Sequence, residues 1–286
     1  MAGQSKTIKT RIKSVKNTKK ITKAMELVSA SKMRRVVART VSARPYIEHA
    51  LEIVHSIKNP SALHPLLTAP ATDGKVLLLV ITSDKGLCGA YNTQIIRAVS
   101  AFTATEDQQC DVVSIGKKGA MALRTSPCNI VASFEQKSCS NVIDAHVVSK
   151  YAIEAFLKGT YTRVLVAHTE YISALNQQAH ITQLLPFAEG PEPVEGYDNI
   201  DKEFIFEPDP ETILDVVIEK IIHTRLYGMV IESVASEESA RMIAMKNASD
   251  AAGEMISDLS LMYNKIRQAG ITQEISEISA GMTSTH

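Results

Sequence analysis

The stretch at residues 245–273, MKNASDAAGEMISDLSLMYNKIRQAGITQ, decides how this chain folds. Its mostly apolar or small residues recur at alternating steps of three and four, at Met245, Ala248, Ala252, Met255, Leu259, Met262, Ile266, Ala269 and Gln273. Such spacing over four consecutive heptads is typical of a coiled-coil seam, where one stripe of a helix packs on another helix. Glycines weaken this helix by up to ~1 kcal/mol each, but they leave the pattern intact.

The helix that carries this seam begins well before it. Asp209 is predicted as its N-cap and Pro210 as its first residue. The carboxylate of Glu211 in the first turn interacts favourably with the positive end of the helix dipole. No proline follows through His286. A helix from 210 to about 280 would be roughly 105 Å long at 1.5 Å per residue. It would exceed any core that the middle of the chain could supply, so its apolar stripe must be buried elsewhere.

The partner for this stripe is predicted at the other end of the chain. Residues 4–44 contain no proline and no glycine. Apolar residues fall there at helical spacing in two triplets that are one residue out of phase, Ile8, Ile12 and Val15, then Ile21, Met25 and Val28. Pro45 is a site for a kink, and the helix is expected to end before Asn59-Pro60. The two terminal helices are therefore predicted to pair as a long antiparallel coiled coil.

The middle of the chain has a different pattern. The run VLLLVI at 76–81 is typical of a strand that is buried on both faces. Further strands are predicted at 111–115, 129–133, 163–168 and 180–184, with helices at 93–104 and 141–157. This alternation predicts an α/β, Rossmann-like domain with a mostly parallel sheet. The expected domains are 1–58 for the N-terminal helix, 75–205 for the sheet domain and 209–283 for the C-terminal helix.

Charge is distributed unevenly along the chain. Residues 1–44 hold thirteen Lys or Arg against the single acid Glu26, a net charge of +12, and because the whole chain is neutral the remainder carries −12. A basic arm indicates a negative partner, such as nucleic acid, an anionic membrane surface or an acidic protein. No apolar run is long enough to span a membrane, and no secretory signal is evident, so we expect a soluble intracellular protein.

The sequence offers weak signals for chemistry. The turn at 83–90, SDKGLCGA, follows a buried strand and precedes a helix, but it does not match a nucleotide-binding loop. The histidines show no metal-ligand spacing, and no catalytic constellation emerges. Cys88, Cys110, Cys128 and Cys139 are too widely spaced for a CxxC unit, so we expect reduced, scattered thiols. A nucleotide-binding α/β enzyme and a basic-helix nucleic-acid-binding protein remain alternatives on these grounds.

Several stretches resemble one family along essentially the whole chain. IKSVKNTKKITKAMELVSASKMRR at 12–35 resembles the N-terminal helix of the gamma subunit of F-type ATP synthases, and residues 236–281 resemble its C-terminal helix. SDKGLCGAYN at 83–92, QLLPF at 183–187 and FEPDP at 206–210 match the family in order and spacing. The chain lacks the long cysteine-containing insertion of chloroplast members, so it resembles the bacterial type.

The resemblance implies a definite function. The paired helices would be the central rotating shaft inside a ring of three alpha and three beta subunits, where catalysis takes place. The sheet domain would lie beside the epsilon subunit and dock on the membrane c-ring, whose proton-driven rotation turns the shaft. The chain itself would be a non-catalytic subunit with no cofactor and no metal. It would be a peripheral protein on the cytoplasmic face of the bacterial inner membrane.

The resemblance also assigns contact residues. Lys23, Met25 and Glu26 of the KAMEL motif would meet the moving levers of the beta subunits, which are acidic in the family and fit the basic arm. A second contact with beta would use residues of RQAGITQE and the positions after it, namely Arg267, Gln273, Glu274, Ser276 and Glu277. Met25 also fits a role in the helix–helix core. Transfer from the family is weakest for the loop at 188–198.

Overall fold

A computed structural model describes residues 2–56, 64–68, 74–106, 108–136, 142–187, 207 and 209–283. The chain divides into two compact units. The helical unit consists of residues 1–30 and 241–286, and the sheet unit consists of residues 31–240. The loop at 188–198 lies outside the described residues.

The sheet unit is built on five strands. They are β1 (Lys75–Ile81), β2 (Cys110–Ile115), β3 (Asn129–Phe134), β4 (Tyr161–Tyr171) and β5 (Gln177–Leu185). The strand order is β3-β2-β1-β4-β5, and all pairs are parallel except β4 with β5. Each predicted strand is confirmed, and so is the mostly parallel α/β fold. The continuous apolar run of β1 is explained by its central position, since Val76 to Ile81 are fully buried.

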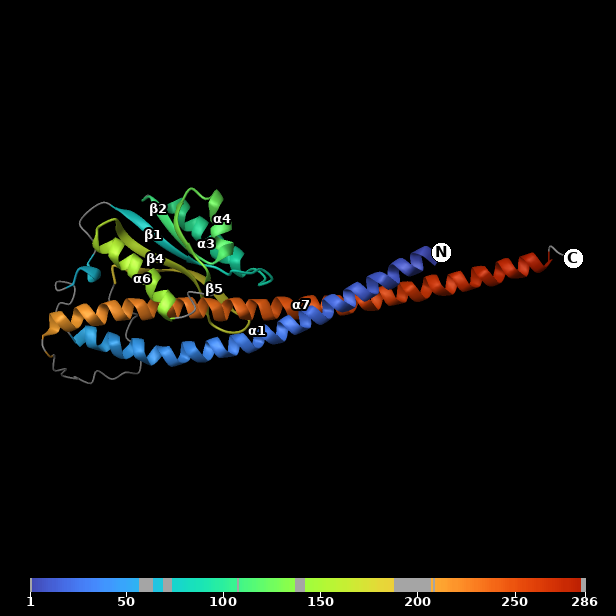
Figure 1. The fold of residues 1–286 in the computed structure, drawn as a ribbon, viewed down its shortest axis with the longest axis horizontal. Helices are drawn as coiled ribbons and strands as arrows, with labels where there is room; N and C mark the ends of the chain where they lie inside the picture. Colours follow the sequence, from blue (N-terminus) through green and yellow to red (C-terminus); the bar gives the residue numbers. More distant parts are fainter. Residues whose placement is uncertain are drawn as a thin grey trace. The chain divides into compact units, whose positions relative to one another are not determined.

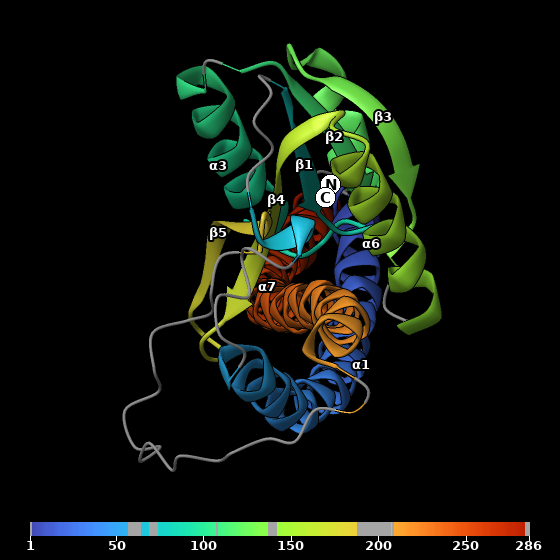
Figure 2. The same cartoon turned by 90° about the vertical axis from the view of Figure 1, so that its left-hand side faces the viewer.

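Helices cover both faces of this sheet, as the layers in Figure 2 show. The helices around it are α3 (Tyr91–Thr105), α4 (Lys117–Ala122) and α6 (Val142–Leu157), with short 3₁₀ turns η1 (Pro65–Leu67) and η2 (Leu123–Thr125). One apolar cluster joins the sheet to α3, and a second joins its other face to α6 and to the first part of α7 (Pro210–Thr283). Both faces are thus closed within the unit.

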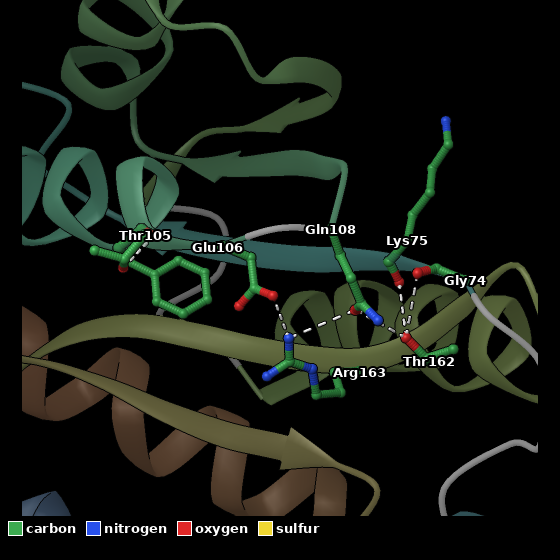
Figure 3. Close-up of polar contacts among 8 residues, drawn as sticks. Gly74, Lys75, Thr105, Glu106, Gln108, Thr162 and Arg163 are labelled. Carbon is green, nitrogen blue, oxygen red and sulfur yellow. Dashed lines mark hydrogen bonds and ion pairs between the residues drawn. The ribbon is translucent and has the colours of Figure 1, made fainter.

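Polar contacts close the amino end of β1 and β4 (Figure 3). Arg163 Nη2 donates to Glu106 Oε1 over 2.6 Å and lies 3.5 Å from Gln108 Oε1. Thr162 Oγ1 lies 3.4 Å from the carbonyl oxygen of Gly74. These contacts tie the segment between α3 and β2 to the start of β4, which keeps the strands in register.

The long helices begin and end close to the predicted positions. α1 spans Ala2–Ser56 and is helical throughout, Pro45 included, and the residues just after it lie outside the described ranges. α7 starts at Pro210, where the N–H of Thr212 donates to Asp209 Oδ1 over 2.8 Å. The predicted N-cap is confirmed. Within the sheet unit, the Ser233 hydroxyl accepts the N–H of Thr169 at 3.1 Å, which anchors α7 to β4.

In the helical unit, the ends of α1 and α7 run antiparallel side by side, as predicted (Figure 1). The predicted seam of α7 is correct at Met245 and Ala252, which are buried. Leu259 and Ile266 continue it as half-buried residues, whereas Gln273 is exposed. The intervening positions are wrong by one residue: Met255 and Met262 are 52% and 53% exposed, and their neighbours Ile256 and Tyr263 are less exposed. The buried stripe keeps the seven-residue repeat, but within each repeat it steps by four and then three residues instead of by three and then four.

The seam of α1 needs the matching correction. Ile21 and Val28 are 60% and 54% exposed, and Thr22 and Ser29 are buried in their place at 9% and 2%. Thr22 and Ser29 continue the seven-residue phase of Ile8. The prediction chose the more apolar residues, but small hydroxyl side chains fit between close helices. The Thr22 hydroxyl donates to the carbonyl oxygen of Lys19 over 3.1 Å, so its polar group is satisfied.

Gly253→Ala is expected to stabilise the chain by about 0.5–1 kcal/mol, because alanine has a higher helix propensity than glycine in the interior of a helix. A Cβ at Gly253 would lie 2.8 Å from Lys19 Nζ, which is the mobile end of a side chain and can shift cheaply. Thermal unfolding of the purified chain measures the effect. Gly270→Ala is the matched control, since no neighbouring atom lies within 4 Å of the added Cβ. A lower melting temperature for Gly253→Ala than for the parent would contradict this account.

Candidate contact surfaces

The predicted contact residues all belong to the helical unit, in two groups. The first group is Lys23, Met25 and Glu26 on α1, and the second is the set from Arg267 to Glu277 on α7. Lys19 of α1 lies against Gly253 of α7, so in an antiparallel pair Met25 lies level with residues near 247. Arg267 is twenty residues further along α7, which is about 30 Å at 1.5 Å per residue. The two groups are therefore separate surfaces.

The first group has an internal ion pair. Lys23 Nζ lies 2.8 Å from Glu26 Oε1 and 2.9 Å from Oε2, one helical turn away. The side chain of Lys23 is 57% exposed, and that of Glu26 is 15% exposed. Met25 is half-buried, so it contributes to the helix pair and still presents part of its surface. An exposed ion pair adds little stability, so its charges are available to a partner at small cost.

The second group is exposed on α7. Arg267, Gln273, Glu274 and Ser276 all present their side chains to solvent, and the Ser276 hydroxyl donates to the carbonyl of Thr272 over 2.9 Å. Glu277 lies within the helix, but its side chain is outside the described residues. This surface combines both signs of charge with amide and hydroxyl groups, which suits a polar contact with another protein.

Sequence reasoning missed an apolar component of the helical unit. Large apolar side chains are 48–61% exposed there, at Ile21, Leu27, Val28, Met255, Leu261, Met262, Ile271 and Ile275. Four of them, Ile21, Val28, Met255 and Met262, were predicted in the seam, and the residue that follows each of them is less exposed. Exposed apolar side chains in such number are typical of a protein interaction surface.

A lysine-lined groove of about 1340 Å³ runs along α1 in the same unit. Its lysines are Lys6, Lys9, Lys13, Lys16, Lys19, Lys20 and Lys23. Six of them recur at steps of three and four, so their spacing in the sequence could have identified the groove as one helix face. The arrangement concentrates positive charge and favours an acidic partner.

The turn at 83–90 uses its polar groups internally. Asp84 Oδ1 accepts the backbone N–H groups of Lys117 at 3.2 Å and of Gln136 at 3.1 Å. The Ser83 N–H donates to Asn92 Oδ1 over 3.0 Å. An aspartate carboxylate therefore occupies the N-terminus of α4, where a bound phosphate would be repelled. This geometry disfavours the nucleotide-binding alternative.

The described part of the sheet unit places Ser149, His223 and Glu219 in one line. The Ser149 hydroxyl is hydrogen-bonded to His223 Nδ1, and His223 Nε2 lies 3.5 Å from Glu219 Oε1. Ser149 is fully buried, so no substrate can reach its hydroxyl, and the contacts join α6 to α7. Among the described residues, no group of three or more His, Cys, Asp or Glu is placed to hold a metal. No described helix is apolar enough over sufficient length to cross a bilayer.

Comparisons with known proteins agree with this arrangement. The family model described as ATP synthase matches residues 4–284. The ATP synthase gamma chain of Verminephrobacter eiseniae is 41% identical over 285 residues, which cover 96% of each chain. That of Janthinobacterium sp. is 39% identical over 282 residues, which cover 96% of this chain and 97% of the relative.

Solved structures show the same fold. A chain of the Tetrahymena thermophila mitochondrial ATP synthase central stalk and c-ring matches with a TM-score of 0.61 at 26% identity, over 80% of this chain and 99% of that one. A chain from the Euglena gracilis mitochondrial ATP synthase matches with a TM-score of 0.71 at 19% identity, over 100% and 96%. The chain therefore belongs to the family of ATP synthase gamma chains, which form the central shaft of the rotary enzyme.

Proposed function

We propose that this chain couples rotation of a membrane ion-driven ring to ATP synthesis and hydrolysis on a surrounding ring of alpha and beta subunits. The observation that carries the proposal is the helical unit, an antiparallel helix pair that keeps apolar and basic side chains exposed. Such a surface is suited to binding other proteins rather than to carrying out chemistry. Membership in the family of ATP synthase gamma chains supports the assignment of those proteins to the same complex.

The chain acts as a non-catalytic subunit in this proposal. Its partners are three alpha and three beta subunits around the helical unit, and the epsilon subunit and c-ring at the sheet domain. It sits at the cytoplasmic face of the bacterial inner membrane as a peripheral protein, one copy per complex. Functionally it divides into a helix at 1–58, a sheet domain at 75–205 and a helix at 209–283.

The two contact surfaces have different roles in transmitting force. Lys23, Met25 and Glu26 meet the moving levers of beta, with the lysine-lined groove facing their acidic side chains. Arg267, Gln273, Glu274, Ser276 and Glu277 meet beta about 30 Å further along the helix pair. Contacts at two heights along the stiff helix pair let it push on a beta subunit without tilting that subunit. Charged contacts that form and break quickly affect the rate of association more than the affinity.

Met25→Lys is expected to impair coupling more than folding. The substitution places an ammonium group where a half-buried apolar side chain lies at the moving contact, and covering that polar group without a partner costs ~1 kcal/mol. That energy corresponds to a roughly fivefold loss in the population of the productive contact. The measurement is proton pumping per ATP hydrolysed in membrane vesicles that contain the assembled complex.

Thr18→Lys is the matched control, because Thr18 is exposed on the same helix two turns away and does not line the lysine-lined groove. It should leave the pumping ratio unchanged, and both variants should assemble at parental levels. A Met25→Lys complex that pumps at the parental ratio would rule out this role for Met25.

Binding of nucleic acid is the second candidate, because the lysine-lined groove also suits a phosphate backbone. The two functions differ in which molecules should remain bound to the chain during purification. Co-purification of alpha and beta subunits from native membranes supports the shaft, whereas salt-dependent retention of DNA without those subunits supports nucleic-acid binding.

A further inference from the structure

Two cysteines lie side by side at the amino end of the sheet, although they are well separated in the sequence. Cys110 is the first residue of β2, and Cys128 immediately precedes β3. These strands are parallel and pair Asp111 with Asn129, so the residues one position earlier face each other. Both cysteines carry free thiols.

This placement fits the geometry of a disulfide. Neighbouring strands lie about 4.8 Å apart, and the Cα atoms of a disulfide are usually about 4.4–6.8 Å apart. Residues in register on parallel strands also present their side chains on the same face. The two sulfurs can therefore be joined mainly by rotation of the side chains.

The two thiols differ in their access to solvent. Cys110 is only 8% exposed and belongs to the apolar cluster beneath α3, and Cys128 packs against that cluster but is half-buried. Because β3 is an edge strand, a small molecule can approach Cys128 from the open side of the sheet.

The environment of Cys110 keeps it protonated. Burial, then the neighbouring Cys128 thiol and the carboxylates of Asp111 and Glu106, raise the pKa of the Cys110 thiol to about 12. Glu106 is held in place by Arg163 (Figure 3). Cys128 is the more exposed of the two thiols, so an oxidant reaches it first. Cys110 then lies beside the product.

We propose that Cys110 and Cys128 form an oxidisable dithiol that a hydroperoxide converts into a disulfide between β2 and β3. The Cys128 thiolate attacks one peroxide oxygen, the O–O bond breaks, and the leaving hydroxide takes up a proton to become water. Cys128 is then a sulfenic acid. The Cys110 sulfur displaces hydroxide from it, and the Cys110 proton leaves with that hydroxide as a second water. Two thiols and one hydrogen peroxide thus give one disulfide and two waters.

The disulfide would fasten the edge strand to the sheet. The segment between the two cysteines contains α4 and η2, which would lie in the closed loop. A cross-link over a loop of this length restricts the opened states and leaves the native strand pairing in place. This proposal does not depend on the contact surfaces of the helical unit.

The test treats the purified full-length chain with hydrogen peroxide under native conditions and then blocks the remaining thiols. Trypsin cuts between the cysteines at Lys117, Lys118 and Arg124, so an intramolecular disulfide appears as two linked peptides by mass spectrometry. The parent chain and Cys88→Ser should both give this linked pair. Amide exchange of β3 should slow by at least about tenfold on oxidation.

Single variants separate the two roles. Cys110→Ser should leave a sulfenic acid at Cys128 that dimedone traps, and Cys128→Ser should leave Cys110 unmodified. Absence of the linked peptides from the parent chain would overturn the proposal. Linkage of Cys128 to Cys88, Cys139 or a second chain, or oxidation of Cys110 in Cys128→Ser, would overturn it as well.

Discussion

Gly116→Ala is expected to unfold the sheet unit at moderate temperature. Gly116 follows β2 with φ at 109° and ψ at 138°, a conformation that side chains rarely adopt. A Cβ there would lie 2.1 Å from the Thr82 carbonyl oxygen and 2.6 Å from its carbon, and backbone atoms cannot move aside as side chains do. Backbone strain and overpacking together should cost about 4 kcal/mol. That is most of the stability of a marginal domain.

The position is sensitive because three strands meet there. The Gly116 N–H donates to the Phe134 carbonyl over 2.8 Å, and the Thr82 N–H donates to the Ile115 carbonyl over 2.7 Å. A shift at Gly116 therefore disturbs the ends of β1, β2 and β3 together. Urea denaturation followed by circular dichroism measures the loss of stability.

Gly86→Ala is the matched control for this prediction. The nearest atom to a Cβ at Gly86 is Lys118 Cε at 4.0 Å, and its backbone is not in the left-handed region. We expect its stability to stay within about 0.5 kcal/mol of the parent. A Gly116→Ala chain with a parental denaturation midpoint would show that this turn can relax and that the argument is wrong.

The second large effect is a loss of stability in acid through His168 on β4. Its side chain is 6% exposed, and its Nε2 lies 3.0 Å from Thr182 Oγ1. Burial, then the charges of His180 and Arg225, lower the pKa of His168 to about 4. The unfolded chain keeps a histidine pKa near 6.5. Below that pH, His168 therefore binds a proton in the unfolded chain while it stays neutral in the folded chain.

The sign follows from these two pKa values. The contribution of neutral His168 is complete above about pH 6.5 and is lost progressively as the pH falls to about 4. Over that window the free energy of unfolding should fall by about 3 kcal/mol. Urea denaturation of the purified chain at a series of pH values measures it.

His168→Gln separates this group from others that titrate in the same range. An amide can keep the contact with Thr182 and takes up no proton, so the slope of stability against pH should flatten between pH 6.5 and 4. His49→Gln is the control at an exposed histidine of α1, which is not among the groups that lower the pKa of His168. An unchanged slope in His168→Gln would assign the acid sensitivity to another residue.

Much of the fold could be predicted because local pattern and tertiary packing agree. The continuous apolar run of β1 and the N-cap at Asp209 can be recognised from residue type alone, and the structure has both at the predicted residues. The phase of the seam was harder, because Thr22 and Ser29 are polar and the more apolar Ile21 and Val28 stand beside them. Side-chain size, and not apolarity, decides which residue fits between the helices.

The proximity of Cys110 and Cys128 could not be predicted, because it follows from strand register and not from spacing in the sequence. The lysine-lined groove is an intermediate case, since its lysines follow helical spacing but a shared face does not reveal a shared groove. The assignments of Lys23, Met25 and Arg267 as contacts with beta stay predictions.

The lysine-lined groove also affects how the chain meets its partners. Seven ammonium groups between Lys6 and Lys23 lie within about 26 Å along the helix. In dilute buffer their attraction extends well beyond contact distance, and at physiological ionic strength it fades within about 8 Å. Ionic strength therefore controls how fast an acidic protein collides with the groove in a productive orientation, and it has less influence on how long the two stay together once the apolar side chains are in contact.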